Sequence, residues 1–161
     1  MDLVRMRKKA WRRGTTAVET AIVFPLLLLV TLGAIHYGWL FLKAQQITNA
    51  ARMAVRMASL PDATIAQVEA AIDSLFTPDR ANITGHAVSF YRTEVDPDTG
   101  EPLTDAGGNP ILTAIGSLAQ GSGVPITVRI TVPRASVDIM NASLFPTPAN
   151  LTASATMAKE G

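Results

Sequence analysis

The chain has 161 residues, a formal net charge of +1, two histidines and no cysteine. Its length allows one membrane segment and one modest domain, and the absence of cysteine excludes disulfides, thiolate zinc sites and thiol nucleophiles. Residues 1–14 carry six basic residues and one acidic residue, so 8 of the 14 basic and 12 of the 13 acidic residues remain for positions 15–161. No basic patch is left in that part to indicate nucleic acid binding.

The basic N-terminus predicts the topology of the chain. Cytoplasmic flanks of membrane segments are enriched in Lys and Arg, so we expect residues 1–14 to stay in the cytoplasm and the acidic remainder to lie across the membrane. The residues on which this orientation depends are Arg7, Lys8, Lys9, Arg12 and Arg13.

An apolar segment follows the basic one. From Thr20 to Leu42 there is no Asp, Glu, Lys or Arg, and a helix of that length spans about 34 Å, enough to cross a bilayer. An ordinary cleaved secretory signal is disfavoured, because its apolar core is shorter and ends at a small-residue cleavage site. The sequence predicts a retained membrane helix over residues 15–42.

Residues 43–161 form the predicted exported domain. The helix is expected to continue to Leu60, where Pro61 ends it. A second helix follows, with Asp62 or Thr64 as N-cap and Gln67 positioned to complete a capping box with Thr64. Its predicted apolar stripe comprises Ile65, Val68, Ile72 and Leu75.

The rest of the domain is predicted to consist of strands and loops. Residues 83–95 are an irregular strand candidate, residues 111–118 are ambiguous, and residues 126–132 alternate cleanly between apolar and polar. A weaker alternation comprises Leu151, Ala153, Ala155 and Met157. The expected fold class is therefore α+β: a long N-terminal membrane helix that continues into a small, pilin-like exported domain with a second helix and an antiparallel sheet.

Glu19 stands at the start of the apolar segment, five residues after Gly14. A carboxylate in a membrane helix is costly unless it is paired, so it usually marks function. Cleavage after Gly14 would free an α-amino group at Thr15. In an assembly of such helices, Glu19 could pair with the ammonium of a neighbouring subunit and fix the axial register.

This pattern resembles the class III signal of type IV pilins and pseudopilins, and more narrowly the TadE-like family of minor pilins and pilus-assembly proteins. The resemblance covers residues 12–60. The matching positions are Arg13, Gly14, Ala17, Val18, Glu19, Pro25, Gly33, Gly38, Asn49, Ala50, Ala51 and Arg52.

The resemblance implies cleavage after Gly14 by a prepilin peptidase, N-methylation of Thr15, and a role with other minor pilins in tight-adherence (Flp-type) pilus assembly at the bacterial inner membrane. Two departures favour a minor or priming subunit over the major pilin. Position 20 is Thr where the family commonly has an aromatic residue, and the exported domain is larger than a major Flp pilin. Some relatives keep an uncleaved anchor, so the alternative is a single-pass periplasmic adaptor or envelope protein.

The apolar helix also contains Pro25, Ala34 and Gly38. Pro25 removes a helical hydrogen bond that neighbouring helices can compensate, and Ala34 with Gly38 forms a small-xxx-small pair suited to helix contact.

The acidic residues between positions 96 and 105 are interpreted as a solvated turn rather than a calcium site. No catalytic motif is present, so we expect a non-enzyme without a metal or cofactor.

Overall fold

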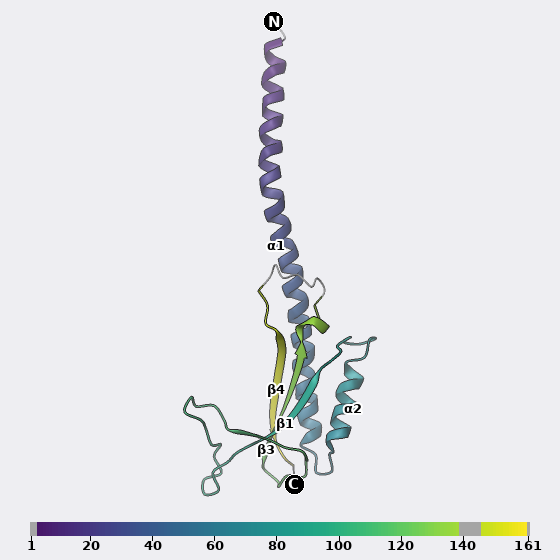
Figure 1. Cartoon of the computed structure of the whole chain (residues 1–161), viewed down its shortest axis with the longest axis vertical. Helices are drawn as coiled ribbons and strands as arrows, with labels where there is room; N and C mark the ends of the chain where they lie inside the picture. The colour runs from purple at the N-terminus through teal and green to yellow at the C-terminus, as the bar shows by residue number, and fades with distance from the viewer. Residues whose placement is uncertain (1–2, 139–145, 161) are drawn as a thin grey trace. The chain divides into compact units, whose positions relative to one another are not determined.

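The computed structural model describes residues 3–138 and 146–160, with side chains described from Thr16 onward. The chain divides into two compact units, Met1–Trp39 and Leu40–Gly161. Helix α1, Leu3–Ala58, contributes to both, and the remaining helices and strands belong to the second unit (Figure 1). The predicted α+β class is confirmed.

Helix α1 ends close to the predicted position. It stops at Ala58, and the next two residues still bond backward, from Ser59 N to Val55 O at 2.9 Å and from Leu60 N to Met57 O at 3.2 Å. Pro61 cannot continue this pattern. Small residues dominate the buried face of the last turns, since Ala50, Ala51, Ala54 and Ala58 are all at most 2% exposed.

Helix α2, Ile65–Leu75, begins with the predicted capping box. The Gln67 backbone N–H donates to Thr64 Oγ1 at 3.3 Å, and the Thr64 backbone N–H donates to Gln67 Oε1 at 3.0 Å. Thr64, not Asp62, is therefore the N-cap. Val68 and Ile72 are buried, and Ile65 and Leu75 pack at the margin of the same core.

Four antiparallel strands form one sheet in the order β2–β1–β3–β4. Their bounds are Leu112–Ala114 for β2, Ala87–Thr93 for β1, Pro125–Pro133 for β3 and Asn150–Ala158 for β4. A single 3₁₀ turn, η1 (Arg134–Ser136), follows β3. The chain from 134 to 149 is otherwise described only up to residue 138 and from residue 146.

The central strand β3 confirms its predicted alternation. Its four alternate apolar side chains are fully buried: Ile126, Val128, Ile130 and Val132. In register with Val128 lie Phe90 of β1 and Ala155 of β4. This face of the sheet shares one apolar core with α1 and α2.

The other three strands are shorter or more exposed than the sequence predicts. Strand β1 starts only at Ala87, because Asn82 and Gly85 have positive φ values of 46° and 66° and turn the chain. The ambiguous segment 111–118 contributes just the three residues of β2. Met157 lies on the edge strand β4 and is 41% exposed, in contrast to the half-buried Leu151, Ala153 and Ala155.

Candidate assembly site

The first unit presents an apolar helix surface. Among the described residues, α1 is the helix that is long and apolar enough to cross a bilayer, over Thr16–Ala58. Large apolar side chains are exposed around its circumference, from Val18 at 62% to Leu29 at 56% and Ile35 at 54%. A helix that is apolar on every side requires lipid or other helices around it.

Hydroxyl groups on this surface are satisfied within the helix. Thr20 Oγ1 donates to Thr16 O, and Thr31 Oγ1 donates to Leu27 O, each at 2.8 Å. Unsatisfied hydroxyls would be costly in hydrocarbon, so these internal bonds make both threonines compatible with a membrane.

Glu19 is exposed near the start of this surface. At about 100° per residue, Ala34 lies about 60° and Gly38 about 100° around the helix from Glu19, whereas Pro25 lies about 120° away in the opposite sense. The predicted assembly residues thus divide: Glu19, Ala34 and Gly38 share one broad face, and Pro25 lies on another. Helix α1 continues through Pro25.

Ala34 and Gly38 are exposed, and a Cβ added at Gly38 would meet no atom within 4 Å. Packing inside this chain therefore does not require a glycine at position 38. The absence of a side chain leaves the backbone open to close approach by another helix.

The predicted processing and topology residues lie partly outside the described side chains. Gly14 and Thr15 are within the helical backbone of α1, as are Arg7, Lys8, Lys9, Arg12 and Arg13. Side chains are described only from Thr16, so the roles assigned to these residues stay predictions.

Two buried lysines that the sequence did not single out hold the second unit together. Lys43 Nζ donates to the carbonyl oxygen of Ala81. Lys159 Nζ donates to Ala58 O at 3.2 Å and to Leu60 O. Each lysine is 4% exposed. Lys43 could have been noticed in the sequence because it is the first charged residue after the uncharged run from Thr20 to Leu42. Nothing in the sequence around Lys159 indicates that it is buried.

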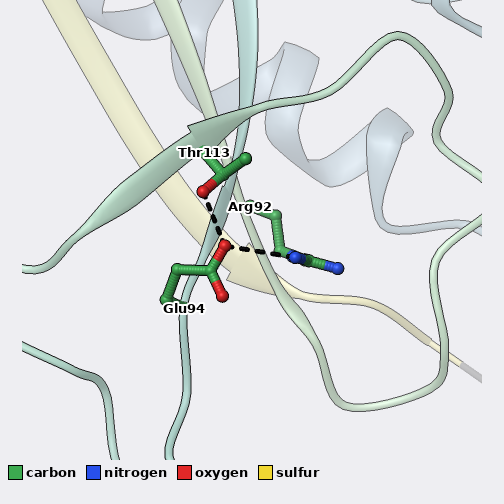
Figure 2. Close-up of polar contacts among 3 residues, drawn as sticks. All are labelled: Arg92, Glu94 and Thr113. Carbon is green, nitrogen blue, oxygen red and sulfur yellow. Dashed lines mark hydrogen bonds and ion pairs between the residues drawn. The ribbon is translucent and has the colours of Figure 1, made fainter.

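A polar cluster fixes the start of the long loop after β1 (Figure 2). Glu94 accepts a hydrogen bond from the Thr113 hydroxyl at 2.5 Å and one from Arg92 Nη2 at 3.1 Å. The bond from Thr113, and secondly the bond from Arg92, hold the pKa of the Glu94 carboxyl below its ordinary value of 4.5. Because the folded pKa is depressed, this contact is complete above the ordinary carboxyl pKa and is lost as pH falls through the folded value.

Replacing Thr113 with valine should raise the pKa of Glu94 toward its ordinary value, because the strongest bond to the carboxylate is removed. The pKa is measured by carboxyl NMR titration of the full chain in detergent. Thr152→Val, at an exposed position on β4, is the matched control and should leave Glu94 unchanged. An unchanged Glu94 pKa in the Thr113 variant would show that the hydroxyl does not stabilise the carboxylate.

Two acidic side chains of the predicted solvated turn accept hydrogen bonds from nearby backbone N–H groups. Asp96 Oδ1 accepts from Asp98 N at 2.8 Å, and Asp105 Oδ1 accepts from Gly107 N at 2.8 Å and Asn109 N at 2.9 Å. The bonds from Asn109 N and Gly107 N lower the pKa of the Asp105 carboxyl. The described residues contain no group of three or more potential metal ligands.

Residues 14–56 of the chain match a protein-family model. No curated protein matches the chain, and no solved structure does. The matched segment covers Gly14, Glu19, the apolar helix and the start of the second unit. Residues 14–56 match the family model described as TadE-like protein, the family that the sequence resembles.

Proposed function

We propose that this chain is a membrane-anchored minor or priming subunit of tight-adherence (Flp-type) pilus assembly in bacteria. The observation that carries the proposal is the TadE-like match, which begins at Gly14 and includes Glu19. The match thus contains the proposed cleavage position, the carboxylate and the apolar helix in one segment. The proposal places the helix in the inner membrane, the N-terminus in the cytoplasm and the second unit in the periplasm.

The physical basis of assembly is the exposed helix surface. Its apolar side chains hold the subunit in lipid before assembly, and the same side chains can pack against other pilin helices afterwards. Glu19, Ala34 and Gly38 share the face on which we propose that a neighbouring helix lies. The partners are other minor pilins of the same system.

Processing supplies the partner for Glu19. A prepilin peptidase would cut after Gly14 and leave an ammonium group on Thr15, which can pair with Glu19 of a neighbouring subunit. The sequence contains no recognised enzyme motif. We propose a non-catalytic role, in which the chain is a substrate of the prepilin peptidase.

One observation favours an uncleaved adaptor as the second candidate. Helix α1 runs from Leu3 through Gly14 without interruption, so the basic segment and the span form one helix. A permanent anchor would have this structure. Leader removal separates the two candidates.

The test is the N-terminal mass of the chain isolated from membranes and from sheared pili. We expect wild-type chain that begins at Thr15 in both fractions. Gly14→Val should retain the leader and be absent from pili, whereas Gly116→Ala, in an exposed loop, should behave as wild type. Wild-type chain that keeps Met1 and never enters pili would refute the proposal and support the adaptor.

A further inference from the structure

The turn that follows α2, residues 77–82, is here called the arginine turn. It is held beside α1 within the second unit, because Lys43 Nζ donates to the carbonyl oxygen of Ala81. The turn is closed by its own backbone, since Arg80 N donates to Thr77 O at 3.0 Å. The bond from Lys43 therefore fixes the level of the turn along α1.

That level coincides with the end of the uncharged run. Lys43 is the first charged residue after Leu42. A bilayer of about 40–45 Å has a hydrocarbon core of about 30 Å, so about 5–7 Å of headgroup layer remains on each side. At 1.5 Å per residue, about four residues of a helix cross that layer. With the uncharged run in the hydrocarbon core, residues 43–46 and the arginine turn lie among the headgroups.

Lys43 itself does not reach the lipid. A lysine just beyond a membrane helix commonly extends its ammonium group to the headgroups. The Lys43 side chain is instead 4% exposed, with its ammonium group on the Ala81 carbonyl. The residue before Ala81 is Arg80, which is exposed. Arg80 thus presents a cation to the solvent at the level where Lys43 does not.

The surroundings of Arg80 are suited to a phosphate. Its guanidinium forms no ion pair within residues 16–138 and 146–160. Arg80 lines a groove of about 380 Å³ that Gln46 and Asn49 of α1 also line, and Asn49 is exposed. A guanidinium binds a phosphate through two parallel N–H bonds, and a nearby amide can donate a third.

The exposed Asp79 next to Arg80 decides which lipid property matters. The two residues together carry no net charge, so long-range attraction to an anionic surface contributes little at this position. The short-range bonds from the guanidinium to a phosphate remain. The site is therefore suited to the phosphate that all phospholipids carry, and the Asp79 carboxylate is compatible with a headgroup that also has an ammonium group.

The most acidic segment starts at the other end of the second unit (Figure 1). The loop of residues 95–111 has four acidic residues and no basic one. It follows β1, whose last residues are in register with the start of β3, which pairs with the end of β4. Lys159, just after β4, bonds to Ala58 at the end of α1.

The distance between the two ends separates their charges. Ala58 is 16 residues beyond Leu42, which is about 24 Å along a helix. This is about three Debye lengths at physiological ionic strength. The carboxylates of the loop therefore do not oppose a phosphate at Arg80, and they lie away from the headgroups that would repel them.

We propose that the arginine turn rests on the surface of the membrane that holds α1, and that Arg80 binds the phosphate of a phospholipid there. The inference rests on the proposed function only for the membrane anchor and its topology. The contact gives the second unit a point of attachment to the membrane in addition to α1. It has to be released when the subunit leaves the membrane for an assembly.

The absence of native cysteine allows a position-specific test. Single-cysteine variants of the full chain carry a bimane label in nanodiscs of phosphatidylethanolamine and phosphatidylglycerol, which also contain a lipid with a nitroxide on its headgroup. Pro78→Cys labels an exposed position in the turn, and Pro102→Cys, an exposed proline of the loop 95–111, is the matched control. Because the two levels are about 24 Å apart, the nitroxide should quench the label at Pro78→Cys at least about threefold more.

Charge variants then test Arg80. Arg80→Glu in the Pro78→Cys chain should reduce the quenching by about two- to fivefold, as expected for the loss of an exposed charged contact. Arg80→Lys keeps the charge and should retain most of it. Arg56→Glu, at an exposed position in the last turn of α1, is the matched control and should leave it unchanged. An unchanged urea midpoint in pulse proteolysis verifies that Arg80→Glu is folded.

Two results would overturn the inference: quenching at Pro78→Cys no stronger than at Pro102→Cys, or quenching that persists in Arg80→Glu. A label at Val30→Cys, on the exposed apolar surface of α1, tests the anchor separately with nitroxides on the acyl chains. Quenching at Val30→Cys without quenching at Pro78→Cys would refute the headgroup contact and leave the proposed function standing. Absence of quenching at both positions would count against the membrane anchor itself.

Discussion

Replacing Glu19 with alanine should leave the chain inserted in the membrane and reduce its incorporation into pili by at least about tenfold. Removing one partner of a buried ion pair typically costs about 3–5 kcal/mol, and about 1.4 kcal/mol corresponds to a tenfold change. Insertion should persist because the substitution makes the apolar helix more apolar. The measurement compares the amounts of the chain in membrane and sheared-pilus fractions.

Two variants make this result specific. Glu69→Ala removes one negative charge from an exposed position on α2 and should enter pili as wild type does. Glu19→Gln keeps the size and polarity of the side chain and should be as defective as alanine, because the ammonium of the neighbour needs a negative charge. Normal incorporation of the alanine variant would remove Glu19 from assembly and favour the uncleaved adaptor.

The parts of the fold that the sequence predicted are those set by local patterns. The capping box of Thr64 and Gln67 needs only residues three apart, and the alternation of β3 is visible within seven residues. Helix α1 was predictable because its apolar run is long and Pro61 follows it. The candidate assembly site is equally local, since Gly14, Glu19, Ala34 and Gly38 lie on one helix.

Contacts between distant positions could not be predicted in this way. The Thr113 hydroxyl reaches Glu94 across 19 positions, and Lys159 reaches Ala58 across 101. Nothing in the sequence near either residue indicates its partner. The loop of residues 95–111 shows a related limit. Its composition indicated a solvated turn, but its backbone bonds, such as that from Leu103 N to Glu94 O, join the ends of segments that β1 and β2 bring together.

Lys159 connects the last residues of the chain to the end of α1. Its backbone N–H donates to Val124 O at 2.9 Å, its carbonyl accepts from Gly123 N at 2.8 Å, and Glu160 N donates to Ser59 O at 2.8 Å. Its ammonium group donates to the carbonyl oxygen of Ala58, the last residue of α1, and to that of Leu60, which also accepts from Ala63 N at 3.3 Å. The charge thus lies where the negative end of the helix dipole favours it.

Lys159→Met should therefore destabilise the second unit by about 1–3 kcal/mol, because the apolar stem is kept, the buried Ala58 carbonyl loses the bond from the ammonium group, and Leu60 O keeps only its bond from Ala63 N. The free energy of unfolding is measured on the full chain in detergent by pulse proteolysis at increasing urea concentration. Glu160→Gln, at an exposed neighbouring position, should change it little. Equal stability of Lys159→Met and wild type would mean that water satisfies the carbonyls of α1 equally well. A measured loss would instead show that the C-terminal strand fixes the end of α1.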